Sequence, residues 1–365
     1  MATRQLKGLP DVRAFFHTNT EPLYFISPTP FNLLGIDRWV RNFYYLNYFD
    51  SFEGTHPRVF VPRKRDRRDF DSMGDVVNHL LSDPETLEFI ADRGPGGKAC
   101  FVMPDEETSG LARQAGLEVM EPPPELRHRL DSKVVMTRLA EEAGVPSVPH
   151  AIGRAGSYAE LLALASGAEL GDDLVVQDPY GNAGSGTFFL RGERDWDQCA
   201  AELTAQREVK VMKRIRNVEV CLEGTVTRYG TVVGPAMTSL VGYPELTPYR
   251  GSWCGNDVWR EALPPEQTRT AREMVRKLGD VLGRQGYLGY FEVDLLHDLD
   301  SDELYLGEVN PRLSGASPMT NLTTEAYADI PLFLFHLLEF MDVDYELDIE
   351  EINARWERGY GEDEV

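Results

Sequence analysis

The sequence has few cysteines and no long hydrophobic run. Its four cysteines, Cys100, Cys199, Cys221 and Cys254, are far apart and form no CxxC pair, so neither a disulfide framework nor a zinc site is expected. The N-terminus has no apolar segment of the signal-peptide type, and the longest apolar run, at 330–341, is too short to span a bilayer. These absences predict a cytoplasmic protein that does not cross a membrane, with a buried helix at 330–341.

Positive charge is also scarce. The 60 acidic and 37 basic residues give a formal net charge of -23 at pH 7, which argues against a nucleic-acid partner and against binding to anionic membranes. An anionic ligand must therefore meet locally concentrated Lys or Arg. The densest basic cluster, at 61–70, is interleaved with acidic residues, and we interpret it as a solvated loop rather than a phosphate site.

The first third of the chain alternates strand-like and helical segments. At 365 residues, 42% of them hydrophobic, the chain can form two or three domains with real cores. Within residues 22–104, the strand-like runs PLYFIS, RVFVP and KACFVMP flank a helical segment at 75–94, which predicts a small parallel sheet covered by helices. The GPGGK motif at 94–98 lacks the preceding strand and following helix of a phosphate-binding loop, so we interpret it as a turn.

A helix is expected directly after the proline run at 122–124, which ends the first domain. Apolar residues recur on one face between Val135 and Ala143, Asp131 or Ser132 can cap the helix, and Gly144 ends it. Lys133 falls in the first turn, off the apolar face. Taken alone, a lysine there is typical of an exposed helix surface.

A glycine-rich loop follows a second helical stretch near 157–166. The segment DLVVQDPYGNAGSGTFFL, at 173–190, is typical of a strand, a glycine loop and a second strand. Glycines in such a loop let backbone N–H groups approach a phosphate closely. An ordinary hairpin turn fits the same segment equally well.

The second half of the chain predicts a strand ladder, a long helix and a hairpin. Lys213, Arg214 and Arg216 fall at a turn of the ladder, before Glu219. Residues 243–259 are loop-like and interpreted as a lid or a surface loop. An amphipathic helix is expected over 266–286, and the acidic tail from residue 342 is expected to be peripheral.

Acidic residues gather in the hairpin expected at 287–312. Strand side chains alternate faces, so Glu292 and Asp294 share one face of the first strand, and Glu308 and Asn310 share a face of the second, together with Leu304 and Leu306. If HDLDSD is the turn, the strands pair antiparallel and bring these oxygen donors together, a set suited to Mg²⁺ and substrate phosphates. Two acidic strands facing water would be the alternative, but the hairpin is largely apolar.

These motifs, taken in chain order, resemble those of the ATP-grasp superfamily. The resemblance rests on Lys133 opening a helix that ends in AGVP, on the glycine loop after LVVQ, on the strand with Glu219, and on GYFEVDLL followed by YLGEVNPR. It covers residues 131 to about 340, and 22–125 resembles the domain that precedes the ATP-grasp core.

The resemblance implies a combined α/β and α+β fold in which a nucleotide lies between two subdomains. The implied domains are a small parallel preATP-grasp α/β domain at 1–130, a small lid subdomain at 131–211, a C-terminal core with the metal site at 212–341, and an acidic tail at 342–365.

It also implies roles for individual residues. The expected ATP contacts are Lys133, Gln177, Gly181, Gly184, Ser185, Gly186, Lys213, Arg214, Ile215 and Glu219. The expected Mg²⁺ ligands are Glu292, Glu308 and Asn310, with Asp294 as an extra ligand. Arg312 would be catalytic, stabilising an acyl phosphate and the tetrahedral intermediate that follows it.

Two positions depart from the family pattern. Gln177 stands where the family usually has a second phosphate-binding lysine, and Met212 stands where adenine-binding segments often have an acid. The first departure is compatible with compensation by Lys210, Lys213 or Arg214, with weak ATP affinity, or with a retired active site. Compensation is favoured, because a retired site has no physical need for clustered carboxylates.

The implied activity is that of an ATP-dependent carboxylate-amine ligase. Such an enzyme forms an amide or peptide bond through an acyl phosphate, releases ADP and phosphate, and here would act on a small-molecule carboxylate and amine, an amino acid or a peptide. Three alternatives remain open: biotin-carboxylase-like carboxylation, acyl transfer to a carrier-bound substrate, and non-catalytic nucleotide binding. Homodimers are common in the superfamily, but the sequence fixes no interface.

Overall fold

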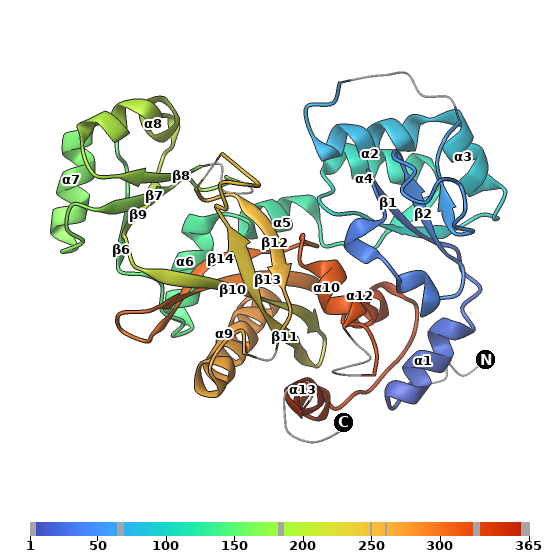
Figure 1. Cartoon of the computed structure of the whole chain (residues 1–365). Helices are drawn as coiled ribbons and strands as arrows, with labels where there is room; N and C mark the ends of the chain where they lie inside the picture. Colours follow the sequence, from blue (N-terminus) through green and yellow to red (C-terminus); the bar gives the residue numbers. More distant parts are fainter. Residues whose placement is uncertain are drawn as a thin grey trace.

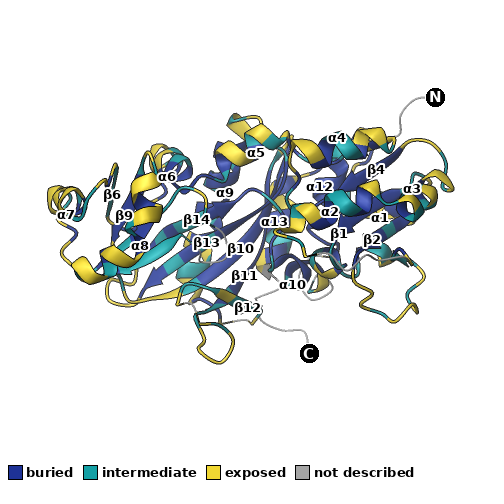
Figure 2. Cartoon of the chain, turned by 90° about the horizontal axis from the view of Figure 1, so that it is seen from above, coloured by how far each residue is buried: buried dark blue, intermediate teal, exposed yellow. Residues whose placement is uncertain are grey.

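The computed structural model describes residues 5–63, 69–181, 186–248, 250–259, 261–323 and 329–358. The described chain contains three sheets, and the sheet formed last in the sequence, by β10 to β14, lies between the other two (Figure 1). The strands of these sheets are mostly buried, whereas many helices turn an exposed face outward (Figure 2).

The N-terminal sheet is parallel and five-stranded, in the order β3-β2-β1-β4-β5. Its strands are β1 Leu23–Ser27, β2 Phe43–Asn47, β3 Val59–Phe60, β4 Gly97–Cys100 and β5 Leu117–Val119. The helices of this part are α1 Leu9–His17, α2 Met73–Ser82, α3 Pro84–Ala91 and α4 Glu106–Gln114, with 3-10 turns η1 Phe31–Leu33 and η2 Ile36–Arg38. Every residue of β1 is buried, as expected of a parallel strand covered on both faces, and the predicted parallel α/β domain is confirmed.

Three details of this domain differ from the prediction. The strands β2 and β5 were not foreseen. The helical segment at 75–94 is two helices, because Asp83 caps a new helix by accepting hydrogen bonds from Glu85 N and Thr86 N, and Pro84 fits only the first turn of that helix. The expected turn at 94–98 is shorter, since Gly97 and Lys98 already pair in β4.

Two helices connect the parallel sheet to the rest of the chain. They are α5 Pro124–Leu130 and α6 Lys133–Glu142. Ser132 caps α6 by accepting a hydrogen bond from Val135 N, so the helix begins where the sequence predicts. Lys133, however, is buried rather than exposed, with 7% of its surface accessible.

The second sheet is small, antiparallel and ordered β6-β9-β7-β8. Its strands are β6 His150–Gly153, β7 Leu174–Gln177, β8 Thr187–Leu190 and β9 Val209–Lys213. The helices α7 Tyr158–Gly167 and α8 Glu193–Ala205 share a hydrophobic core with one face of the sheet. The predicted strand, loop and strand are confirmed as the β7–β8 pair.

The third sheet is antiparallel, with the order β12-β11-β10-β13-β14. Its strands are β10 Asn217–Thr227, β11 Gly230–Val241, β12 Trp253–Asp257, β13 Gly289–Asp298 and β14 Leu304–Asn310. The long helix α9 Pro265–Arg284 covers one face. The β13–β14 hairpin is confirmed, but the loop-like segment at 243–259 contains the edge strand β12.

The C-terminal helices pack between the third sheet and the parallel sheet. They are α10 Ser317–Leu322, α12 Phe333–Phe340 and α13 Ile349–Arg358. The buried helix predicted at 330–341 is confirmed as α12. Residues 343–358 are not peripheral, because Tyr345 and Trp356 are fully buried in a hydrophobic core that includes residues of β1 and α1. Across the described ranges, no helix is both long and apolar enough to cross a membrane.

Candidate active site

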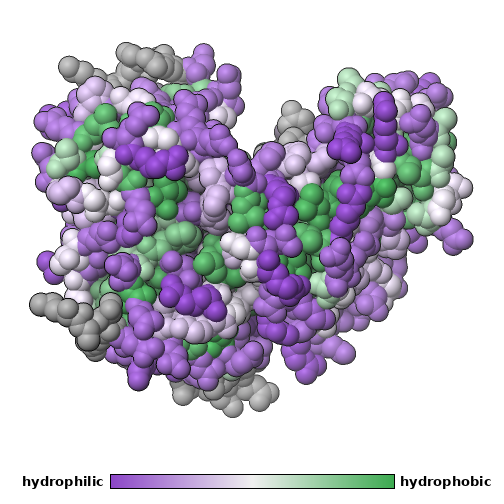
Figure 3. Space-filling model, turned by 180° about the vertical axis from the view of Figure 1, so that it is seen from behind, coloured by the Kyte–Doolittle hydropathy of each residue, from purple (hydrophilic) through white to green (hydrophobic). Residues whose placement is uncertain are grey.

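A cavity of ≈ 650 Å³ lies between the two antiparallel sheets. The space-filling view shows a notch between the lobe that carries α7 and α8 and the lobe that carries the parallel sheet (Figure 3). Residues of both antiparallel sheets line the cavity, among them Gln177, Gly181, Met212, Lys213, Arg214, Ile215, Glu219, Asp294 and Glu308. The structure therefore places many of the expected ATP-binding residues around a single space.

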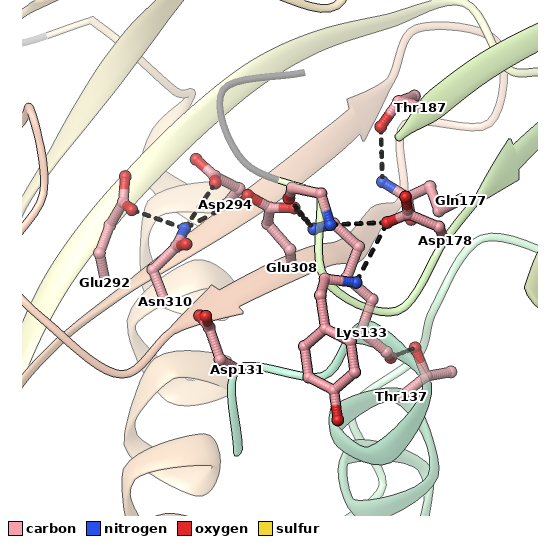
Figure 4. Close-up of polar contacts among 12 residues, drawn as sticks. Asp131, Lys133, Thr137, Gln177, Asp178, Thr187, Glu292, Asp294, Glu308 and Asn310 are labelled. Atoms are coloured by element: carbon pink, nitrogen blue, oxygen red, sulfur yellow. Dashed lines mark hydrogen bonds and ion pairs between the residues drawn. The ribbon is translucent and has the colours of Figure 1, made fainter. Parts of the chain in front are cut away.

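The oxygen donors of the β13–β14 hairpin form one cluster beside this cavity (Figure 4). Glu292 is the register partner of Asn310, and Asp294 is the partner of Glu308. Asn310 Nδ2 lies 2.8 Å from the Glu292 carboxylate, 3.2 Å from that of Asp294 and 3.4 Å from that of Glu308. The four expected metal ligands are thus adjacent.

A bulge at Gly307 directs the cluster toward the cavity. The register shifts between Asp294 and the next residue of β13, so that Gly307 is an extra residue in β14. Leu304 and Leu306 consequently pack in the core beneath α9, whereas Glu308 lines the cavity. The expectation that these leucines share a face with Glu308 is wrong, because strict alternation does not continue through a bulge.

Burial and mutual repulsion raise the pKa values of the clustered carboxyl groups. Burial, followed by the charge of Glu223, raises the pKa of Glu292 to about 8. Burial, followed by the charge of Glu292, raises the pKa of Asp294 well above its ordinary value. The pKa of Glu219 is raised to about 7 by burial and then by the charge of Glu308. So many acidic groups in one buried place call for a cation.

The donor set fits a hard divalent cation. Ligand atoms of Cys221, Glu292 and Asp294 lie within 4.8 Å of one another, and Glu308 and Asn310 add two more oxygen donors. Carboxylate and amide oxygens suit Mg²⁺. The single soft ligand, the Cys221 thiol, already accepts a hydrogen bond from Asn256 Nδ2 over 3.1 Å, which leaves a site made of oxygen atoms.

Lys133 connects the acidic cluster to the glycine loop. Its Nζ forms an ion pair with Glu308 over 3.0 Å and donates to the carbonyl oxygen of Gly181 over 2.5 Å (Figure 4). The Lys133 backbone N–H also donates to Pro179 O. The start of α6 thus holds both a candidate metal ligand and the beginning of the loop.

Asp178 closes the base of the same loop. Its carboxylate accepts hydrogen bonds from Tyr180 N and Gly181 N, and its backbone N–H donates to Gly186 O. Gly186 has a φ of 78°, and a Cβ atom there would lie 2.4 Å from the Asp178 carboxylate. Glycine is therefore required at this end of the loop. The expected contacts Gly184 and Ser185 fall outside the described residues.

Arg312 follows the hairpin and lies between the Asn310 amide and the Asp131 carboxylate. Its Nη2 donates to Asn310 Oδ1 over 2.8 Å, and its Nε lies 4.0 Å from Asp131 Oδ1. Asp131 in turn pairs with Arg127 of α5 over 3.7 Å. The guanidinium group is thus held at the junction of the metal cluster and the helices that lead from the parallel sheet.

Comparisons with known proteins agree with this geometry. No family model matches the chain. Urea amidolyase of Saccharomyces cerevisiae is 26% identical over 239 residues, which is 61% of this chain and 12% of that protein. The biotin carboxylase domain of Hydrogenobacter thermophilus 2-oxoglutarate carboxylase, solved as a dimer with MgADP, ADP and bicarbonate, superimposes with a TM-score of 0.65 at 14% identity, covering 90% of this chain and 72% of that one. The chain therefore has the fold of the ATP-grasp proteins.

A second solved structure of similar fold carries the name of a different enzyme. Carboxyaminoimidazole ribonucleotide synthase of Aspergillus clavatus, solved with ATP, gives a TM-score of 0.59 at 13% identity, with 92% of this chain and 79% of that chain covered. These likenesses cover most of the chain and support its fold, a parallel α/β domain followed by two antiparallel sheets. The chain spans less than a third of the length of the curated relatives it matches.

The structure shows where Gln177 and Met212, the two departures from the ATP-grasp pattern, lie. Gln177 donates to Thr187 Oγ1 over 3.4 Å at the end of β7, and Met212 is near the end of β9. Of the three candidate compensating cations, Lys213 and Arg214 line the cavity. Lys210 is fully buried on β9, directly opposite Gln177 in the register.

Several residues of the site were not foreseen as functional. Asp178 clamps the loop, Cys221 lies beside the metal cluster, and Asp131 contacts Arg312. The segment DPYG at 178–181 did carry a signal for Asp178, since aspartate before a turn commonly accepts backbone hydrogen bonds. Cys221 had no such signal, because its place depends on the pairing of β10 with β13.

Proposed function

We propose that this ATP-grasp protein is an ATP-dependent ligase that activates a carboxylate as an acyl phosphate and joins it to an amine. The observation that supports this most directly is a cluster at the edge of one cavity, which Asp294 and Glu308 line. The other members of the cluster are the oxygen donors Glu292 and Asn310, the ammonium group of Lys133 and the guanidinium group of Arg312. Phosphoryl transfer requires this combination of oxygen ligands and cations at the place where charge develops.

In this proposal ATP occupies the cavity between the antiparallel sheets. The connection between β9 and β10, including Lys213, Arg214 and Ile215, gives adenine contacts, and Glu219 gives a polar contact to the ribose. Gln177, Lys133 and the loop residues Gly181, Gly184, Ser185 and Gly186 contact the phosphates. The support is that the described members of this set, other than Lys133 and Gly186, line the cavity, while Lys133 and Gly186 bond to the base of the loop.

Glu292, Glu308 and Asn310 hold Mg²⁺ in this proposal, with Asp294 as an additional ligand. Bound Mg²⁺ neutralises phosphate charge and orients the transferring phosphoryl group. Ligation would commit the Glu308 carboxylate to the cation, and Lys133, which now pairs with Glu308, would then be available to phosphate oxygens. Asn310 presents an oxygen only if its amide turns, because at present Oδ1 accepts from Arg312 and Nδ2 donates to the carboxylates.

The reaction consists of two displacements. A substrate carboxylate oxygen attacks the γ-phosphorus, the bond from that phosphorus to the bridging oxygen breaks, and ADP leaves with the electron pair. The amine then attacks the acyl carbon, the bond from carbon to the phosphate oxygen breaks, phosphate leaves, and the nitrogen loses one proton. Arg312 stabilises the acyl phosphate and the tetrahedral oxyanion, since a guanidinium group can bind two oxygen atoms at once.

The favoured substrates are an amino acid or small peptide as acid and an amine of the same kind. The second candidate acid is bicarbonate, because a structural relative was solved with bicarbonate beside MgADP. Against bicarbonate, the residues after Arg312 read LSGASPM, without the Gln and Glu-His that follow the equivalent arginine in biotin carboxylases. Dimerisation, as in that relative, and the domain boundaries at 130, 211 and 341 belong to the same proposal.

The test is nucleotide turnover with Mg²⁺ and ATP against separate pools of amino acids, peptides and bicarbonate, with ADP resolved from AMP and new condensed masses recorded. ADP and phosphate that depend on an amino-acid or peptide pool support the ligase. ADP formed only with bicarbonate replaces it with the carboxylation reaction. ATP binding without turnover in any pool favours a carrier-bound acceptor or a non-catalytic binder, and AMP would contradict the mechanism.

A further inference from the structure

Lys210 is a buried cation without a hydrogen-bond partner among the described residues. The side chain lies on β9, its exposed surface is 0%, and its Nζ contacts no acceptor in the part of the chain that the structure describes. Burying an ammonium group without an acceptor is costly. A bound ligand that carries acceptor oxygens would supply the hydrogen bonds that the Lys210 ammonium group lacks and so offset this cost.

The alternation of β9 shows which way Lys210 points. Its neighbours Val209 and Val211 belong to the core beneath α7 and α8, so Lys210 and Met212 point to the opposite face of the sheet. Met212 lines the cavity. Lys210 is therefore on the face of the small sheet that is turned toward the proposed nucleotide site.

The register of the sheet places Lys210 beside Gln177. The two residues are direct partners in the antiparallel β7–β9 pair, and Gln177 lines the cavity next to the start of the glycine loop. Gln177 donates to Thr187, but its Oε1 is buried and has no partner within the described ranges. An ammonium group and an amide without full hydrogen bonding thus lie side by side at the loop end of the cavity.

Charge compensation for Lys210 now comes mainly from Glu308. The Glu308 carboxylate stabilises the ammonium form of Lys210, whereas Lys133 opposes it. The same carboxylate is the ion-pair partner of Lys133 and a proposed metal ligand. When Glu308 ligates a metal ion, both lysines lose this compensation, and phosphate oxygens are the anionic groups that can replace it.

We propose that Lys210 binds the phosphate chain of the nucleotide and supplies, from β9, the positive charge that Gln177 does not supply from β7. The proposal rests on the proposed function, because it takes ATP as the ligand of the cavity. It requires the side chains that cover Lys210 to move when the nucleotide binds, since the lysine has no exposed surface in the present arrangement.

The test measures binding of ADP and of a non-hydrolysable ATP analogue, both with Mg²⁺, by calorimetry, together with thermal unfolding of the ligand-free protein. The variants are Lys210→Met, Lys210→Gln and the exchange Gln177→Lys with Lys210→Gln. Lys98→Met is the matched control, because Lys98 is also buried but pairs with Glu118 over 2.6 Å in the parallel domain.

Lys210→Met is expected to weaken nucleotide binding roughly 10- to 100-fold, as loss of a charged hydrogen bond does, and to raise the unfolding temperature of the ligand-free protein. The exchange variant is expected to recover most of the affinity lost in Lys210→Gln. Lys98→Met is expected to lower the unfolding temperature and to leave nucleotide affinity unchanged.

Nucleotide affinity within twofold of wild type in Lys210→Met would overturn the proposal and leave the ligase intact. An exchange variant that binds nucleotide no better than Lys210→Gln would also overturn the proposal and leave the ligase intact. Nucleotide binding that depends on Lys210, in a protein that turns over no substrate from the pools, would support the inference independently of the ligase. A wild-type protein that binds neither nucleotide would overturn both.

Discussion

Asn310 donates a hydrogen bond to the Glu292 carboxylate over 2.8 Å, directly across the β13–β14 pair. This contact joins the two strands of the hairpin at the proposed metal site. The Asn310 amide lies among three carboxylates and so holds them together while no cation is bound. The site is therefore largely preformed, and binding a metal ion requires a change of partners rather than a change of fold.

Glu308→Gln is predicted to reduce activity by about 100-fold or more with the fold unchanged. The substitution removes one negative oxygen ligand and leaves the side-chain volume the same, so no cavity forms. ADP formation and its dependence on Mg²⁺ concentration measure the effect. Glu303→Gln, at an exposed position in the turn of the same hairpin, is the control, and a fully active Glu308→Gln enzyme would refute the metal assignment.

Arg312→Lys is predicted to lower kcat by about 100-fold while the KM for ATP stays close to wild type. Lysine keeps the charge but cannot bind two oxygen atoms in one plane, so the loss falls on the acyl phosphate and the oxyanion. Steady-state kinetics separate the two constants. The control is Arg276→Lys on α9, where Arg276 pairs with Glu273, and it is expected to change neither kcat nor KM. If Arg312→Lys instead raised only the KM for ATP, Arg312 would be a nucleotide-binding residue.

Gly186→Ala is predicted to weaken nucleotide binding and to destabilise the loop base. The backbone there has a φ of 78°, and the new Cβ atom would meet the Asp178 carboxylate, which is held by Tyr180 N and Gly181 N. The conformational strain alone costs about 1–2 kcal/mol. Calorimetric titration of ADP measures the effect against Gly167→Ala, where a Cβ atom meets nothing. Equal affinity in the two variants would argue against a role of the loop base.

His336 makes the stability of the protein depend on pH. Its Nδ1 accepts from Tyr290 N over 3.1 Å, and its Nε2 donates to Met120 O over 2.8 Å, which ties α12 to the parallel domain. Burial lowers the pKa of His336 to about 4 from an ordinary value of 6.5. Between these two pH values the unfolded chain binds a proton that the folded protein excludes, so stability falls as the pH falls through this window.

The His336→Gln variant isolates this effect from the titration of buried carboxyl groups. Glutamine retains a donor for Met120 O but does not titrate. We expect the free energy of unfolding of wild type, relative to that of the variant, to fall by about 3 kcal/mol between about pH 7 and about pH 4. Denaturant unfolding at several pH values measures it. A difference that stays constant with pH would mean that His336 titrates alike in both states.

The proposed metal site was predictable because its parts are close in sequence. A hairpin with a short turn has only a few possible registers, and the acidic pairs converge in those that place Asp294 opposite Glu308 or Asn310. The observed pairing reaches such a register through the bulge. The bulge at Gly307 was not predictable from alternation. It explains how Leu306 belongs to the core and Glu308 to the cavity, although the two residues have the spacing of neighbours on one face.

Long-range pairing set the limit of the sequence prediction elsewhere. Lys210 became notable only when the register placed it opposite Gln177 and the fold buried it, because its strand carries no local sign of its neighbours. The prediction of a peripheral C-terminal tail was wrong for a related reason. Its acidic composition is typical of a solvated segment, but Tyr345 and Trp356 are large apolar anchors that pack into a core formed by residues far away in the sequence.

The most direct test of the central claim is to follow oxygen during turnover. Enzyme, Mg²⁺ and ATP are incubated with the acid substrate found in the pool assay, labelled with ¹⁸O in its carboxylate, and the released phosphate is analysed by mass spectrometry. An acyl phosphate intermediate predicts one ¹⁸O atom in each inorganic phosphate, because the attacking carboxylate oxygen remains on phosphorus when the amine displaces it. Unlabelled phosphate, or label recovered in AMP, would contradict the account.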